Sequence, residues 1–149
     1  MLKQVYIHKT VDKSLKERMA YIFDEFQNIV VSISGGKDST VLCWTALQEA
    51  HKRGRKIGIF FLDEEVDYQS TIDQVTWLMN LYPENTVRLW FQFPFNLTNS
   101  TSYRQGQLIC WEPGKHDIWM RPKVPYSIQH IPWDRSKTTI RDKNKGFGF

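Results

Sequence analysis

Hydrophobic residues near the start of the chain recur at the three- and four-residue intervals of one helix face. They begin after Ser14, which stands three residues before Glu17 in the arrangement of a capping box. The apolar positions are Leu15, Met19, Ile22, Phe23 and Phe26. This pattern predicts an amphipathic helix that packs on the core.

Two short apolar runs follow, with a helical stretch between them. Residues 29–33 (Ile-Val-Val-Ser-Ile) have the composition of a strand buried on both faces, and residues 57–62 form a second run that is too short for a helix. From about Ser39 to Arg53 the spacing is helical, and Gly54 stands where a helix C-terminus favours glycine. These stretches predict a strand, a helix and a second central strand.

The same alternation continues for one more unit. Asp67 is placed to cap a helix that must end before Pro83, and residues 86–93 predict a third strand. The apolar face of that helix would be Ile72, Val75, Leu78 and Met79. Strands that alternate with helices predict a parallel sheet with right-handed crossovers, so we expect an α/β protein with a doubly wound sheet.

The periodicity fades after Pro94. We expect residues 95–107 to form a polar loop, and residues 108–111 and 118–120 to pair as a hairpin across residues 112–115. Later prolines exclude a long regular element, namely Pro122, Pro125 and Pro132. The last part of the chain is therefore predicted to be an irregular extension.

The composition is typical of one globular domain. With 149 residues, of which 41% are hydrophobic, the chain can bury a core. We divide it into an N-terminal helical segment (1–28), a core (29–94) and a C-terminal extension (95–149). No apolar run is long enough to span a bilayer and the first residues do not resemble a secretory signal, so we expect a cytoplasmic protein without membrane contact.

The charge is distributed unevenly. Residues 1–100 hold 11 Lys and Arg against 12 Asp and Glu, a net charge of −1, whereas residues 101–149 hold 9 against 4, a net charge of +5. A polyanion such as nucleic acid would bind to the second part, but a basic tail that merely aids solubility has the same composition. The sequence leaves both interpretations open.

The strongest functional signal in the sequence is a glycine pair, with polar residues around it, that follows the first predicted strand. At a strand-to-helix turn, backbone N–H groups and the positive end of the helix dipole point at one spot, and Gly35 and Gly36 allow an anion to approach the backbone. Lys37 adds a positive charge, and Asp38 a carboxylate able to hold a magnesium ion that comes with a nucleotide. Hydroxyl donors come from Ser34, Ser39 and Thr40. A polar turn that only caps a helix is the simpler interpretation, but the combination favours phosphate binding.

The sequence of residues 34–39, Ser-Gly-Gly-Lys-Asp-Ser, closely resembles the PP-loop of the adenine nucleotide α-hydrolase-like superfamily. Over about residues 25–95 the chain is most similar to the phosphoadenosine phosphosulfate (PAPS) reductase family, including its phage- and genomic-island-borne members. The resemblance implies a PP-loop fold that binds an adenine nucleotide (ATP, APS or PAPS), with Asp63 beside the adenosine. It favours an enzyme without choosing between ATP pyrophosphatase, adenylyltransferase and PAPS reductase.

As an enzyme, the protein would use Lys37, Asp38 and the loop amides to stabilise the phosphates while an acceptor attacks the α-phosphorus, giving an adenylated product and pyrophosphate. PAPS reductases resemble one another in a nucleophilic cysteine on the C-terminal tail, and residues 141–149 contain none. Cys110 could replace that thiol, but like Cys43 it stands in an apolar run and is expected to be packed. Thiol-dependent reduction is therefore the least favoured reaction.

As a binding module, the protein would sense the nucleotide and meet nucleic acid or a protein partner through residues 101–149. The basic and aromatic candidates there are Trp111, Trp119, Arg121, Lys123, Trp133, Arg135, Lys137 and Arg141. A small second core would also account for the tryptophans. The histidines and cysteines lack the spacing of zinc or iron–sulfur ligands, so we expect neither cofactor. Whether the chain forms a homo-oligomer, or another chain completes the site, stays open.

Overall fold

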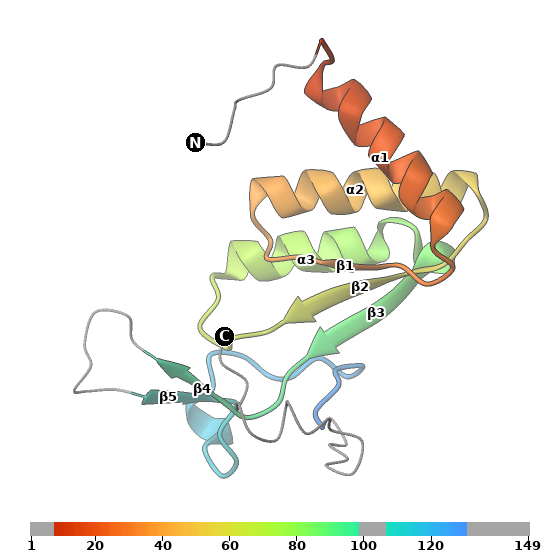
Figure 1. The fold of residues 1–149 in the computed structure, drawn as a ribbon. Helices are drawn as coiled ribbons and strands as arrows, with labels where there is room; N and C mark the ends of the chain where they lie inside the picture. Colours follow the sequence, from red (N-terminus) through yellow and green to blue (C-terminus); the bar gives the residue numbers. More distant parts are fainter. Residues whose placement is uncertain (1–7, 99–106, 131–149) are drawn as a thin grey trace, which may run out of the picture.

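The computed structural model describes residues 8–98 and 107–130 (Figure 1). In chain order its first elements are α1 (Val11–Glu25), β1 (Val30–Ser32), α2 (Lys37–Lys52), β2 (Ile57–Leu62), α3 (Gln69–Leu81), the 3-10 turn η1 (Pro83–Asn85) and β3 (Thr86–Phe91). β4 (Phe95–Thr98), β5 (Gln107–Cys110) and the 3-10 turn η2 (His116–Ile118) follow. The predicted alternation of three strands with two helices is confirmed.

The strands β1, β2 and β3 form a parallel sheet in that order, with Val31 beside Ile59 and Ile59 beside Arg88. Each crossover passes through one helix. Because successive strands are added in one direction across the sheet, right-handed crossovers place α2 and α3 on the same face. The two helices lie side by side there (Figure 1). The protein is therefore a mixed α/β protein with a three-stranded parallel sheet, as predicted.

The hydrophobic core lies between this face of the sheet and the helices. Strands and helices both contribute to it, with Val31, Ile33, Leu47, Ile57, Ile59, Phe61, Val75, Leu78, Met79 and Trp90. α1 adds the buried side chains of Met19 and Phe23 and contacts α2. Among the described helices, none combines the length and the apolar character that crossing a membrane requires.

The first strand differs from its prediction. The sequence predicts that residues 29–33 are buried on both faces, but β1 is an edge strand, and Val30 is 60% exposed. Val30, Gly58 and Val87 are register partners on the face away from α2 and α3, and Val87 is 46% exposed. No helix covers this face in the described part of the chain. The β-branched run therefore reflects strand propensity and one buried face.

Two helices begin differently from their predictions. Thr10 is the N-cap of α1 and its Oγ1 accepts the N–H of Lys13 at 3.2 Å, so Ser14 lies inside the helix rather than at a capping box. α3 begins without a side-chain cap. Asp67, the predicted cap, instead accepts the N–H of Glu64 at 3.3 Å. In both cases the predicted residue has the right chemistry but does not occupy the N-cap position: Ser14 follows Thr10 by four residues, and Asp67 directly precedes Tyr68.

The C-terminal extension is more regular than predicted. β4 pairs antiparallel with β5, and Phe95 lies beside Cys110. The prediction of a polar loop over 95–107 is therefore wrong at both ends, and its middle part, 99–106, lies outside the described residues. β5 pairs with β4, so the predicted pairing of residues 108–111 with 118–120 is also wrong. The strand signal was the alternation Phe-Asn-Leu-Thr, and four residues are too few to distinguish a strand from a loop by periodicity.

A segment near residue 128 closes the outer edge of β3. Ile128 donates its N–H to Trp90 O at 2.7 Å and accepts the N–H of Gln92 at 3.0 Å, in a parallel bridge beside Phe91. Tyr126 packs edge-on against the Trp90 ring, with the ring centroids 6.2 Å apart. These contacts tie the C-terminal extension to the sheet.

Candidate functional site

The predicted phosphate-binding loop joins β1 to α2. Gly35 has φ of +73°, in the left-handed region that favours glycine, and Gly36 is the extended N-cap of α2. No side chain caps this helix. The first-turn N–H groups and the positive end of the α2 dipole are therefore available to an anion.

Ser39 holds this loop in shape. Its Oγ accepts the N–H of Ser34 at 3.2 Å and donates to Gly36 O at 3.0 Å, and it lies 3.2 Å from Ser34 Oγ. The two serines, which the sequence suggests as ligand donors, thus already serve the turn itself. The side chains of Lys37 and Asp38 are exposed at the start of α2.

The N-terminus of α3 meets the same loop. A Cβ atom at Gly35 would lie 2.6 Å from Thr71 Cγ2 and 3.3 Å from Thr71 O, so the loop backbone is in direct contact with the first turn of α3. Tyr68, the N-cap of α3, makes no side-chain capping bond. Two uncapped helix N-termini therefore meet at the carboxyl edge of the sheet, which is where open α/β sheets bind ligands.

A pocket of about 390 Å³ lies at this meeting point. Its lining consists of Gly35, Lys37, Thr40, Ser70, Thr71 and Gln74. Thr40 Oγ1 is buried and has no hydrogen-bond partner among the described residues. Buried hydroxyls are normally hydrogen-bonded, so Thr40 Oγ1 has unused hydrogen-bonding capacity beside the pocket.

Three pocket residues come from α3 and are not among the predicted site residues, namely Ser70, Thr71 and Gln74. The signal was present, because they stand in the first two turns of the helix after the second strand. The rule that places ligands at the carboxyl ends of strands applies to them as it does to Asp63. Hydroxyl and amide side chains at a helix start are common caps, so nothing in their type distinguished them.

Asp63 lies at the carboxyl end of β2, as predicted, and is fully buried. Its carboxylate accepts hydrogen bonds from Trp90 Nε1, Gln92 Nε2 and the N–H of Glu65, each at 2.9 Å, and pairs with Arg121. Four donors occupy its two oxygens, so this side chain organises the protein around it. Its position beside an adenosine stays a prediction.

Both cysteines are buried free thiols, as expected. Burial raises the pKa of Cys43 to about 11. Burial, and then the nearby carboxylates with Glu65 first, raise the pKa of Cys110 to about 12, and its Sγ donates to Glu64 O at 3.0 Å. Because the thiolate is the nucleophile, neither thiol is prepared for covalent chemistry at neutral pH.

The described acidic side chains can be compared with the arrangement that a metal site requires. Within the described ranges, no group of three or more His, Cys, Asp or Glu side chains converges on one point. Magnesium commonly uses one or two carboxylates together with substrate phosphates. Asp38, exposed in the first turn of α2, fits such a shared site.

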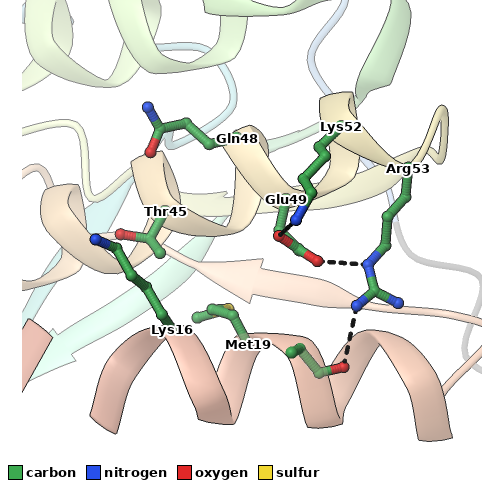
Figure 2. A pocket seen from close by; sticks show the side chains of 8 residues that line it. Lys16, Met19, Thr45, Gln48, Glu49, Lys52 and Arg53 are labelled. Carbon is green, nitrogen blue, oxygen red and sulfur yellow. Dashed lines mark hydrogen bonds and ion pairs between the residues drawn. The ribbon is translucent and has the colours of Figure 1, made fainter. Parts of the chain in front are cut away.

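A second cleft, of about 350 Å³, lies between α1 and α2 (Figure 2). Arg53, the C-cap of α2, bonds there to Glu49 and Asp24, each at 2.5 Å, and to Ala20 O at 3.5 Å. Its charge is thus paired within the cleft. Arg53 stands at the opposite end of α2 from Lys37, so this cleft is separate from the pocket at the loop.

The fold and the pocket together define an α/β protein with a polar pocket at the carboxyl edge of a parallel sheet. The chain is 32% identical over 110 residues to the uncharacterized protein YbdN of Escherichia coli (strain K12). The aligned residues make up 73% of this chain and 27% of YbdN, so the chain spans about a quarter of that relative. No protein-family model matches the chain, and no solved structure gives a significant match.

Proposed function

We propose that this chain is a PP-loop protein similar to the PAPS reductase family, and that its pocket binds the phosphates of an adenine nucleotide (ATP, APS or PAPS). The observation that carries the proposal is the pocket between two uncapped helix N-termini, with the unpartnered hydroxyl of Thr40 in its wall. Backbone amides, two helix dipoles and Lys37 all favour an anion there. The proposal includes a doubly wound sheet, of which α2 and α3 cover one face.

The same pocket suits adenylyl transfer or pyrophosphate release from ATP. Lys37 and the loop amides would neutralise charge on the β- and γ-phosphates while an acceptor oxygen bonds to the α-phosphorus and pyrophosphate leaves with the electrons of the broken bond. Asp38 would ligate a magnesium ion that arrives with the nucleotide and screens its phosphates. The described residues that line the pocket include no general base, and an acceptor that is already anionic needs none.

The described part of the C-terminal extension helps to weigh two alternative functions, a thiol-dependent PAPS reductase and a non-catalytic binding module. Thiol-dependent PAPS reduction is disfavoured by the burial and the raised pKa of Cys110. A nucleotide-sensing module that binds nucleic acid or a protein through residues 101–149 is the second candidate. Of its proposed contact residues, Trp111 is buried and Arg121 is paired with Asp63, as in a small second core. Others lie outside the described residues, namely Trp133, Arg135, Lys137 and Arg141.

A survey of nucleotides tests the proposal. The protein is unfolded thermally in the presence of ATP, APS, PAPS or GTP, with and without magnesium. An adenine nucleotide at about 100 times its Kd should add about 2.7 kcal/mol to the free energy of unfolding and raise the Tm. Equal shifts with GTP, or no shift with any adenine nucleotide, would reject the proposal. Pyrophosphate release from ATP with sulfate, flavin or nucleic-acid acceptors then distinguishes an enzyme from a binding module.

A further inference from the structure

The loop from Asp63 to Asp67, between β2 and α3, is held by the C-terminal extension. Trp111 Nε1 donates to Asp63 O at 2.7 Å, and Cys110 Sγ donates to Glu64 O at 3.0 Å. The backbone N–H of Trp111 also bonds to the buried carboxylate of Glu65. These donors come from 46 to 48 residues further along the chain.

Arg121 completes the contacts to this loop. Its Nη1 donates to Glu65 O at 2.7 Å and to Asp67 O at 3.3 Å, and its Nη2 pairs with the Asp63 carboxylate. Its Cζ lies 5.6 Å from the centroid of the Trp111 ring. The side chain of Arg121 is 13% exposed and that of Asp63 is fully buried, so solvent and salt screen this ion pair little.

The loop has a conformation that needs such support. Glu65 has φ of +64°, and a left-handed conformation costs a residue other than glycine about 1 to 2 kcal/mol. The loop runs directly into α3, so its path sets where the first turns of that helix lie. Ser70, Thr71 and Gln74 in those turns line the pocket. Arg121 does not line the pocket itself, but its contacts hold the loop that positions the pocket residues of α3.

We propose that Arg121 is a positioning residue for the pocket, which holds the loop from Asp63 to Asp67 so that the N-terminus of α3 meets the phosphate-binding loop. The inference rests on the proposed function, and it gives the C-terminal extension a part in building the site. Arginine suits this task because one planar guanidinium bonds a carboxylate and two carbonyls at once. A lysine ammonium in its place would keep the positive charge but lose the planar set of N–H donors that reaches all three acceptors.

The substitution Arg121→Lys separates positioning from charge balance. It retains a cation for Asp63, so we expect a folded protein. We also expect faster amide hydrogen exchange over residues 64–71. ATP affinity should fall by about tenfold, because only about a tenth of the molecules would then hold the start of α3 in the binding-competent position. Arg53→Lys is the matched control, because Arg53 also bonds two carboxylates and a carbonyl, at the other end of α2. It should change neither quantity.

The exchange and affinity measurements test the inference and the proposed function separately. Unchanged exchange over residues 64–71 in Arg121→Lys overturns the inference whether or not ATP binds, and so does faster exchange with unchanged ATP affinity. If the wild-type protein binds no adenine nucleotide, the proposed function falls, and the exchange data still decide whether Arg121 fixes the start of α3. Should Arg121→Lys not fold, Trp111→Phe removes the bond to Asp63 O, keeps a ring beneath Arg121, and should accelerate exchange of the same amides.

Discussion

Gly35 and Thr71 are in contact where the loop between β1 and α2 meets α3: a Cβ atom at Gly35 would lie 2.6 Å from Thr71 Cγ2. Gly35 also has the left-handed φ of +73°. Gly36 differs, because its φ is −75° and a Cβ there would lie 3.5 Å from Ser34 Oγ, an ordinary contact. The loop therefore requires glycine at position 35 for its own shape, whereas its shape does not require glycine at position 36. Under the proposed function, Gly36 would instead allow the ligand to approach the backbone.

We predict that Gly35→Ala destabilises the protein by about 1 to 3 kcal/mol and abolishes nucleotide binding, because the loop must leave its conformation or displace Thr71. Gly36→Ala should change the free energy of unfolding by less than about 1 kcal/mol. Chemical denaturation measures both values. Equal destabilisation by the two substitutions would contradict the different roles that we assign to the two glycines.

Lys37→Ala should weaken ATP binding by about 1.5 to 3 kcal/mol, the range for a charge-assisted hydrogen bond. Its free energy of unfolding should stay unchanged, because the Lys37 side chain is exposed. Isothermal titration calorimetry measures the affinity. Lys52→Ala is the control, since Lys52 is an exposed lysine in the last turn of the same helix. An unchanged Kd in folded Lys37→Ala would mean that the phosphates bind elsewhere.

The sequence predicted the central elements because their signals are local. The apolar runs of β2 and β3 and the helical spacing of α2 and α3 each fall within one short window, so periodicity sufficed. The glycine turn after β1 was predicted for the same reason. The exposed side of β1 was not predicted, because burial of Val30 depends on what covers the sheet and not on the residue itself.

The environment of Asp63 could not be predicted in this way. Its ion-pair partner Arg121 lies 58 residues further along the chain, in a stretch without periodicity. The backbone carbonyl of Asp63 likewise finds its donor on Trp111, which the sequence presents as either a stacking platform or a core residue. Long-range pairing of this kind has no signature in a single sequence. The consequence is that the family resemblance places Asp63 beside a ligand, while the structure shows how the protein itself uses the carboxylate.

Both thiols should resist alkylation in the native protein. Because the folded state raises the pKa of Cys43 to about 11 and that of Cys110 to about 12, the thiolate fraction at pH 8 is lower than in the unfolded chain. Iodoacetamide should therefore label neither residue until denaturant is added. Cys110→Ser should keep nucleotide binding and any ATP-dependent turnover. Rapid native labelling of Cys110, together with loss of turnover in folded Cys110→Ser, would revive the reductase interpretation.

The buried ion pair of Asp63 and Arg121 should matter far more for stability than the exposed pair of Asp24 and Arg53. Asp63→Asn leaves Arg121 without its buried counter-charge and turns one acceptor atom into a donor facing other donors, so we expect a loss of about 3 to 5 kcal/mol. Asp24→Asn should cost less than about 1 kcal/mol, because the Asp24 side chain is 62% exposed. Chemical denaturation of both variants gives the comparison.

In a double-mutant cycle with Arg121→Gln, the double variant should lose less stability than the two single losses added together. Additive losses, or an Asp63→Asn cost as small as that of Asp24→Asn, would show that this ion pair does not hold the loop.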